Sequence, residues 1–328
     1  MKRKKAFITG IAGQDGSYLA EHLLENDYDV FGIIRRNSTV EHQRTRIENL
    51  TDIKLEYGDV TDFSSISKQL KLIKPDEVYN LAAQSHVRVS FDVPEFTVQS
   101  NGIGVLNVLE CFREHCPKGK LYQASSSEMF GSSVDEDGLQ RESTKMLPVS
   151  PYGAAKLLGF HLVRLYRTSY NLFCSNGILF NHESPRRGSN FVTNKVIKTA
   201  VEIKLNKSNV LELGNMDAKR DWGHSKDYVR AMKLILNHNK PDDWTVSTGF
   251  TFSVRDLCEY TFKKLDLDYN DYVISNPKFF RPQELPYLKG DSSRIRSELG
   301  WSPDYSFEQT LDEMIEHWLK IYKNSELP

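Results

Sequence analysis

The sequence predicts an α/β protein built on a doubly wound parallel sheet, with a smaller lobe in the C-terminal part of the chain. In the first half of the 328 residues, short apolar runs alternate with stretches whose apolar residues repeat every three or four positions. A polar or glycine-rich break follows each apolar run, and after residue 178 the alternation weakens. Successive βαβ units produce this pattern. We therefore expect a sheet-forming part over 1–178, rejoined by 223–250, and a lobe made of 179–222 and 251–328.

The expected elements can be placed in chain order. A strand over 6–9 leads through a glycine-rich turn into an amphipathic helix around 18–24, and a second strand covers 30–34. Further strands are expected at 54–57, 77–81 and 120–124, with helices at 66–73 and 105–112 between them. In the second half we expect a long polar loop at 181–190, a helix at 195–203, a strand at 210–213, a turn at 220–224, a strand at 244–247 that rejoins the sheet, and helices at 254–265 and 307–322.

Composition excludes several classes of protein. The chain has 43 Lys and Arg against 44 Asp and Glu, so its net charge of −1 offers nucleic acid or an anionic membrane no general attraction. No segment approaches the ~18–20 apolar residues of a membrane span, and no secretory apolar core follows the basic start at 2–5. The four cysteines, Cys111, Cys116, Cys174 and Cys258, lack metal-type spacing. We expect a cytoplasmic protein with no metal and no nucleic-acid or membrane partner, with Cys111 and Cys174 in its core.

Three glycines separate the first strand from the first helix. Gly10, Gly13 and Gly16 follow a G-x-x-G-x-x-G spacing, which differs from the G-x-G-x-x-G fingerprint of dinucleotide-binding turns. Glycines at this place let backbone amides approach a pyrophosphate at the N-terminus of a helix. The alternative is an ordinary glycine-rich turn.

The second strand ends at Arg35 and Arg36, where an NAD-binding protein would place an acidic residue for the ribose hydroxyls. A guanidinium suits a 2′-phosphate instead, so the expected cofactor is NADP. The alternative is a solvated pair of arginines. Residues 58–62 and 81–85 follow later strands and would form the rim on which adenine and the nicotinamide ribose rest.

A tyrosine and a lysine stand four positions apart, which places both side chains on one face of a helix. We expect the Lys156 ammonium to lower the pKa of Tyr152, so that the phenol can act as a general base. Ser126 and Glu128 follow the strand just before and would bring a hydroxyl and a carboxylate to the same cleft. The alternatives are a strand-end turn hydroxyl for Ser126 and a solvated loop acid for Glu128.

Seven segments distributed over nearly the whole chain resemble a known family. With these segments the chain resembles the extended short-chain dehydrogenase/reductases, and among them closely the GDP-mannose 4,6-dehydratases. The segments are 9–19 (TGIAGQDGSYL), 32–36, 80–87, 150–156, 176–188 (NGILFNHESPRRG), 220–224 and 280–282, of which 176–188 is particularly specific. The resemblance implies a Rossmann sheet that binds NADP, a C-terminal lobe that binds a GDP-sugar, and assembly as a homodimer or homotetramer.

The resemblance also assigns residues to roles. The catalytic residues would be Ser126, Glu128, Tyr152 and Lys156. The cofactor-binding residues would be Gly10, Gly13, Gln14, Asp15, Gly16, Arg35, Asp59, Val60, Leu81, Ala83, Ser85, Lys156, His182 and Arg187. The substrate-binding residues would be Ser85, Asn181, Lys195, Arg220, Arg281 and Glu284. For several of these residues the alternative is a structural role. This role would be an ion pair for Lys195, Arg220 and Arg281, and bracing of a loop for His182 and Arg187. Trp222 is expected to pack within its loop.

The implied reaction is dehydration of a GDP-hexose to the 4-keto-6-deoxy sugar. Tyr152 would take the proton of the 4-hydroxyl while hydride passes to the nicotinamide, Glu128 would remove the proton at carbon 5 and assist loss of water, and hydride would return to carbon 6. A 4-epimerase or 4-keto reductase would not need Glu128, and a non-catalytic NADP-sensing module remains a third hypothesis.

The chain departs from the family pattern at three places. It has Ser126 for a threonine, Phe96 for a tyrosine near the cofactor, and an unusual segment over 37–49. The sugar is open between GDP-mannose and a GDP-manno-heptose, which would need more room near Ser85 and Asn181.

Overall fold

The computed structural model describes residues 3–36, 45–280 and 282–324. Its centre is a sheet of seven parallel strands in the order β11-β6-β5-β4-β1-β2-β3. The strands are β1 (Lys4–Thr9), β2 (Tyr28–Ile34), β3 (Ile53–Tyr57), β4 (Glu77–Asn80), β5 (Lys120–Ser126), β6 (Phe173–Leu179) and β11 (Asp243–Val246). Because β1 pairs with both β2 and β4, the strand order reverses beside β1, and ligands of such sheets bind beyond the carboxyl ends of the strands at this point. The predicted doubly wound α/β fold is confirmed, and the strand expected at 244–247 does join the sheet.

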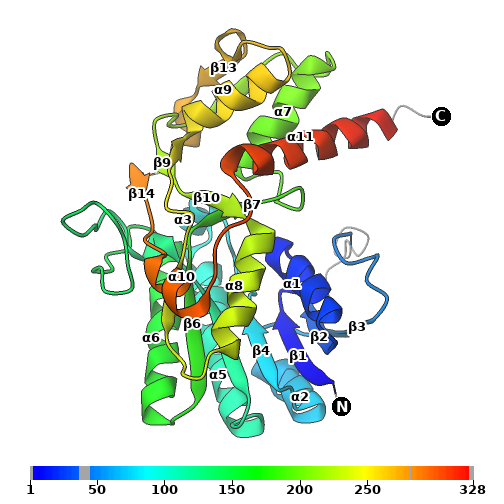
Figure 1. The fold of residues 1–328 in the computed structure, drawn as a ribbon, viewed down its shortest axis with the longest axis vertical. Coiled ribbons are helices and arrows are strands. Elements are labelled where there is room, and N and C mark those ends of the chain that lie inside the picture. Colours follow the sequence, from blue (N-terminus) through cyan, green and yellow to red (C-terminus); the bar gives the residue numbers. More distant parts are fainter. Residues whose placement is uncertain (1–2, 37–44, 281, 325–328) are drawn as a thin grey trace.

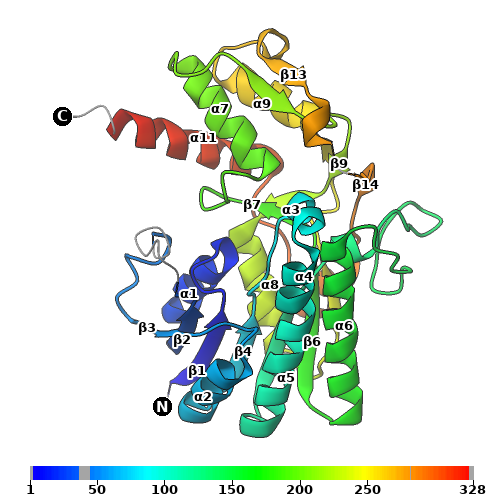
Figure 2. The same cartoon turned by 180° about the vertical axis from the view of Figure 1, so that it is seen from behind.

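Helices cover both faces of the sheet (Figures 1 and 2). On one face, α1 (Gln14–Glu25) and α8 (Ser225–Asn237) enclose a core that contains Leu19, Met232 and Trp244. On the other, α2 (Phe63–Ile73), α5 (Gly104–His115) and α6 (Pro151–Ser169) enclose a second core with Leu70, Val108 and Val163. The helices α3 (Val87–Asp92) and α4 (Pro94–Val98) and a π-helical turn (Gln99–Ile103) run into α5.

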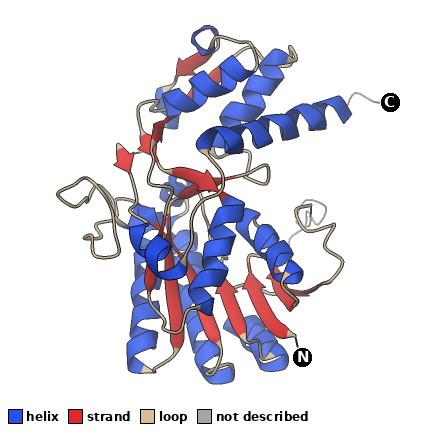
Figure 3. Cartoon of the chain, viewed as in Figure 1, coloured by secondary structure: helices blue, strands red, loops and turns tan. Residues whose placement is uncertain are grey.

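A third core lies in the part of the chain above the carboxyl ends of the strands (Figure 1). There α7 (Val192–Lys204), α9 (Val254–Lys264) and α11 (Phe307–Asn324) pack around Ile197, Phe262 and Met314, and the short strands lie beside them (Figure 3). These strands are β8 (Leu211–Leu213), β9 (Lys219–Arg220), β12 (Phe252–Ser253), β13 (Val273–Ser275) and β14 (Tyr287–Leu288). No helix among the described residues combines the length and the apolar character that crossing a membrane requires.

Two stretches differ from the expected structure. The loop expected at 181–190 begins with strand β7 (Asn181–Glu183), and the turn expected at 220–224 consists of the end of β9 and strand β10 (Trp222–His224), which pairs with β7. Both strands are too short to show a period of two in the sequence. Their hydrogen bonds join segments about forty residues apart, which a local pattern cannot indicate.

Four α-helices among the described residues were not expected: the short α3 and α4, and also α8 and α10. In α8 the apolar residues Tyr228, Met232 and Ile235 repeat at intervals of four and three and are all buried, so the helical signal was present in the sequence. The short α10 (Ser293–Leu299) lies in the segment expected in the upper lobe, but its Ile295 belongs to the core that α1 and α8 enclose.

Candidate active site

The glycine turn closes tightly against the next strand end. Gly10 has a φ of +71°, which disfavours other residues, and a Cβ on Gly16 would stand only 2.3 Å from the Gly10 carbonyl oxygen. Thr9 anchors the turn because its hydroxyl accepts hydrogen bonds from the backbone N–H groups of Leu81 and Ala82, each at 3.1 Å. Gly13 caps α1 without a side-chain hydrogen bond. The first amides of α1 are therefore presented to an anion by backbone alone.

A cavity of about 450 Å³ opens at this turn. Twelve predicted cofactor-binding residues line it: Gly10, Gly13, Gln14, Asp15, Gly16, Arg35, Asp59, Val60, Leu81, Ala83, Ser85 and Arg187. The predicted Lys156 and His182 do not line it. Gly58, Ala82 and Gln84, which also line it, belong to the rim expected from the sequence. The sequence predicted no site role for the lining residues Ala12, Ile33, Ile34, Arg46 and Ser100, and Phe96 was singled out only as a departure from the family pattern.

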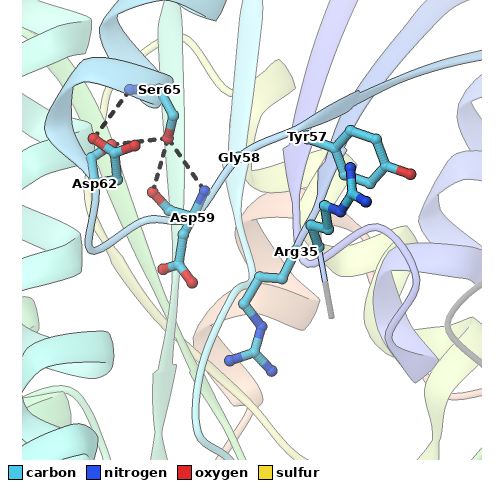
Figure 4. A pocket seen from close by; sticks show the side chains of 7 residues that line it. Arg35, Tyr57, Gly58, Asp59, Asp62 and Ser65 are labelled. Carbon is cyan, nitrogen blue, oxygen red and sulfur yellow. Dashed lines mark hydrogen bonds between the residues drawn. The ribbon is translucent and has the colours of Figure 1, made fainter. Parts of the chain in front are cut away.

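A second cavity of about 550 Å³ adjoins the first and shares Arg35, Gly58 and Asp59 with it (Figure 4). Ser65 fixes one wall, because its hydroxyl donates to the backbone carbonyl of Asp62 at 2.9 Å and accepts from the Asp59 N–H at 3.2 Å. On the other side Arg35 extends from the end of β2. Its guanidinium carbon lies 6.0 Å from the centre of the Phe96 ring. Arg35 therefore stands where the two cavities meet.

The four predicted catalytic residues come from the end of β5 and the start of α6. Ser150 starts α6 by accepting a hydrogen bond from the Gly153 N–H at 3.0 Å, and this places Tyr152 and Lys156 in the first two turns. The Ser126 hydroxyl hydrogen-bonds the Tyr152 phenol and also accepts from the Glu128 N–H at 3.2 Å. All four side chains belong to buried residues.

The expected lowering of the tyrosine pKa is wrong for this geometry. Burial raises the pKa of Tyr152 to about 12, a rise to which the Glu128 charge adds and which the Ser126 hydrogen bond opposes. Lys156 donates to the Ala124 carbonyl at 2.8 Å instead of reaching the phenol, and its ammonium nitrogen lies 5.8 Å from the centre of the tyrosine ring. Burial lowers the pKa of Lys156 to about 8, and the Asp15 charge limits that fall.

A buried charged network lies under the glycine turn. His182 contacts Asp15 at 2.8 Å and the Phe180 carbonyl at 2.7 Å, and its ring stacks on Tyr228 at 4.3 Å. Arg187 contacts Glu183 at 3.0 Å while it lines the cavity. His182 therefore braces the turn from below, which agrees with the bracing role weighed for it, whereas Arg187 both braces and faces the cavity.

Of the predicted substrate-binding residues that the structure describes, only Ser85 lines either cavity. Arg220 and Glu284 form an ion pair at 2.8 Å, and Arg220 also donates to the Leu285 carbonyl at 2.7 Å. Lys195, on α7, donates to the Glu212 carbonyl at 2.6 Å, and its ammonium lies 3.8 Å from the centre of the Phe279 ring. Asn181 begins β7 and Ser85 lines the first cavity. Arg281 lies outside the described residues.

Three residues expected to have structural roles have them. Cys111 and Cys174 are fully buried in the core beneath α5 and α6, and both are free thiols. Trp222 is buried and stacks on Phe307 with ring centres 5.8 Å apart.

Comparison with known proteins identifies the family. The sequence matches the family model described as GDP-mannose 4,6 dehydratase over residues 7–314. A Drosophila melanogaster protein named GDP-mannose 4,6 dehydratase is 44% identical, over 98% of this chain and 88% of that protein.

Solved structures share the fold. A UDP-glucose 4-epimerase from Thermotoga maritima with UDP-glucose has a TM-score of 0.85 at 22% identity, covering 97% of this chain and 99% of that one. A dTDP-glucose 4,6-dehydratase from Bacillus anthracis in complex with NAD has a TM-score of 0.84 at 20% identity, covering 98% of both chains. Since epimerase and dehydratase share this architecture, the fold alone does not separate the two activities. The sequence matches do separate them, and the chain belongs to the GDP-mannose 4,6-dehydratase family, a family of nucleotide-sugar hydro-lyases.

Proposed function

We propose that the chain converts a GDP-hexose, with GDP-mannose as the first candidate, into its 4-keto-6-deoxy derivative. The single observation that supports this most is the buried Glu128 carboxylate in the group with Tyr152 and Ser126. An epimerase or a 4-keto reductase needs the tyrosine and the lysine but no carboxylate for carbon 5. Family membership supports the same reaction.

The cofactor we propose is NADP. The glycine turn, the start of α1 without a side-chain cap and the adjoining cavities support a dinucleotide. Arg35, which lines both cavities, supports NADP because a guanidinium suits a 2′-phosphate. When bound, a nicotinamide supplies reversible hydride exchange. Because hydride taken from carbon 4 is returned to carbon 6, no reduced cofactor accumulates over a complete cycle.

The chain's own residues move the protons. Tyr152, hydrogen-bonded to Ser126, accepts the proton of the 4-hydroxyl as the phenolate and becomes the neutral phenol. The positive charge of Lys156 favours the phenolate before this transfer. Glu128 then removes the proton at carbon 5, which the adjacent ketone has acidified, and returns it to the departing 6-hydroxyl as water leaves. The carboxylate thus ends the elimination as it began. When hydride returns to carbon 6, carbon 5 would take up the proton that Tyr152 accepted, so neither residue gains a proton over the cycle.

The test is to incubate the purified protein with GDP-mannose and, separately, with a GDP-manno-heptose, and to follow the product mass. We expect loss of one water without accumulation of NADPH. A product of unchanged mass and altered stereochemistry would indicate an epimerase, and stoichiometric reduction of the cofactor would contradict the dehydration mechanism. The heptose reaction tests whether the space near Ser85 and Asn181 admits a longer carbon-6 arm.

We also propose that nucleotide binding belongs to 1–178 with 223–250, that sugar binding belongs to 179–222 with 251–328, and that the chain forms a homodimer or homotetramer. Exposed apolar side chains on neighbouring helices support assembly: Val98 at the end of α4, Ile103 in the π-helical turn, and Leu158 and Leu165 on α6. Light scattering after gel filtration gives the mass in solution. A monomer at micromolar concentration would contradict the assembly.

A further inference from the structure

Ser90 is the only buried residue of the short helix α3, although its two neighbours in the sequence are apolar. A buried hydroxyl is tolerated only when it is hydrogen-bonded. The Ser90 hydroxyl donates to the Val87 carbonyl at 2.6 Å and accepts from the backbone N–H of Tyr152 at 3.2 Å. Both directions are fixed, because a carbonyl can only accept and an N–H can only donate. Ser90 therefore ties α3 to the backbone of the tyrosine in the candidate active site.

The first turn of α6 depends on this contact. The first N–H groups of a helix have no partner inside the helix, so the first turn frays unless other groups accept from them. The first residue of α6 is a proline, which has no N–H, and the Gly153 N–H is bound by the Ser150 hydroxyl at 3.0 Å. Between them, the Tyr152 N–H is bound by Ser90, which stands 62 positions earlier in the chain. A distant segment thus helps to cap the helix that carries the tyrosine.

The same segment continues from the rim of the first cavity. Ser85 lines that cavity, and α3 begins two residues later. The Ser90 N–H donates to the His86 carbonyl at 3.2 Å, so the serine is held by the residue that follows the rim. At its other end, the Tyr152 phenol hydrogen-bonds Ser126. The tyrosine is therefore held at its backbone by the rim segment and at its hydroxyl by the end of β5.

We propose that Ser90 is a positioning residue: by binding the Tyr152 N–H it sets where the phenol stands between Ser126 and the cavity. The inference rests on the proposed function, since the step that it affects is the proton transfer assigned to Tyr152. Ser90 lines neither of the two cavities described above. A displacement of a reacting group by about 1 Å costs about a hundredfold in rate. Loss of the Ser90 hydroxyl should therefore slow turnover and leave binding almost unchanged.

The test compares two variants of the full chain. Ser90→Ala removes the acceptor, and Ser90→Cys fills the same place with a sulfur that accepts only weakly. In both, kcat for dehydration of GDP-mannose should fall by about ten- to a hundredfold, while KM and the Kd of NADP⁺ stay within about threefold of the wild type. Deuterium exchange at the Tyr152 amide, located by mass spectrometry of fragments, should become faster in both variants. Melting curves separate slow turnover from loss of folding.

Thr97→Val is the matched control. Thr97 is fully buried on the neighbouring helix α4, and its hydroxyl donates to the Val93 carbonyl at 2.9 Å, much as Ser90 donates to Val87. Within the part of the chain that the structure describes, this hydroxyl makes no hydrogen bond to α6. Valine keeps the shape of the side chain and removes the hydroxyl, so kcat and the exchange of the Tyr152 amide should stay within about twofold of the wild type.

The outcomes separate this inference from the proposed function. Unchanged kcat in Ser90→Ala would overturn the inference and leave the function standing. A fall in kcat for Ser90→Ala but not for Ser90→Cys would show that Ser90 only fills space, and a weaker Kd or higher KM with kcat retained would place it in binding. Either result overturns the inference.

If the wild type does not convert GDP-mannose, the proposed function fails, and the exchange measurement decides the inference by itself. Faster exchange of the Tyr152 amide in both variants would then support Ser90 as the residue that positions the tyrosine. Unchanged exchange would overturn the inference as well.

Discussion

His182 donates a hydrogen bond from Nε2 to the carboxylate of Asp15, at 2.8 Å, across 167 positions of the sequence. Its other ring nitrogen contacts the Phe180 carbonyl at 2.7 Å. A carbonyl and an ionised carboxylate can only accept, so both ring nitrogens carry protons and the imidazole is positively charged. The glycine turn and β7 are therefore joined by a buried ion pair.

Replacing His182 by phenylalanine tests this pair. Although burial works against both charges, Asp15 raises the pKa of His182 and His182 lowers the pKa of Asp15. The ion pair stabilises the folded state fully at pH values below the ordinary pKa of histidine. This stabilisation is lost as the pH rises through the raised pKa of His182. His182→Phe keeps a ring against Tyr228 but strands a buried carboxylate. It should lower the free energy of unfolding by about 3 kcal/mol at pH 6.

Urea unfolding between pH 6 and pH 9 measures this difference, which should shrink as pH rises. His161→Phe, at an exposed position on α6, is the control and should stay within about 0.5 kcal/mol of the wild type throughout. A difference for His182→Phe that does not vary with pH would mean that the imidazole is neutral.

Lys156→Met should make the protein more stable at neutral pH. Burial lowers the pKa of this lysine to about 8, so above that value the unfolded chain binds more protons and stability rises with pH until the ordinary lysine value near 10.5. Methionine avoids the buried charge but leaves the Ala124 carbonyl without its donor. We expect a net gain of about 1 kcal/mol at pH 7, falling to a loss above pH 10. Thermal unfolding at several pH values checks the trend, and a loss at pH 7 would contradict it.

Glu128→Gln should abolish dehydration while leaving the fold and cofactor binding intact. The amide keeps the shape of the side chain but cannot accept the carbon-5 proton, and loss of a general base costs about 10²- to 10⁴-fold in rate. Mass spectrometry of the nucleotide sugar measures the loss of water. Glu136→Gln, at an exposed position in the loop after β5, should retain full activity. Retention of activity by Glu128→Gln would assign the elimination to another group.

Arg35→Ala should change cofactor choice rather than cofactor binding in general. If Arg35 pairs with the 2′-phosphate, its removal weakens NADP⁺ by about ten- to a hundredfold and leaves NAD⁺ within about twofold. Competition titrations with the two dinucleotides give the ratio. Equal weakening of both would place the guanidinium against a group that they share.

Trp222→Ala should destabilise the protein without affecting cofactor binding. The indole is buried and stacks on Phe307, which in turn stacks on Phe252 at 4.0 Å, so its removal leaves a hole that costs about 3–5 kcal/mol. Denaturant unfolding measures the cost, and the dissociation constant of NADP⁺ at low temperature should change by less than about threefold. If Trp222→Ala binds NADP⁺ more weakly than the wild type when the same fraction of each protein is folded, Trp222 has a role in the site.

The sheet could be predicted because its signals are local. The apolar runs that form β1, β2, β4 and β5 are each buried on both faces. Each strand can therefore be predicted from its own run of residues, without knowledge of its partner strands. The pairing of β7 with β10 depends on two segments about forty residues apart, and neither segment has a pattern of its own. The apolar residues of α8, by contrast, repeat at helical intervals, which is a local signal of the same kind as that of the strands.

The candidate site likewise has residues that local spacing predicts and properties that depend on the folded chain. Tyr152 and Lys156 are four positions apart on a helix, and this spacing was enough to predict that they lie on one face. Ser126 and Glu128 could be added because they stand at the end of the preceding strand. The direction of the tyrosine pKa was wrong because it depends on how deeply the phenol is buried, which no spacing reveals. Arg46 could not be found from the sequence, since its place at the turn results from three loops that meet only in the folded chain.

The contact between Arg220 and Glu284 has a consequence for how a nucleotide sugar would enter. In the substrate-binding role that the family resemblance implies for Arg220, its guanidinium would pair with the diphosphate of the GDP-sugar, yet an internal carboxylate already neutralises it. Arrival of the nucleotide is then an exchange of one anion for another rather than a filling of empty space. Part of the attraction is consumed in releasing Glu284, and this favours ligands carrying two or more negative charges over singly charged competitors.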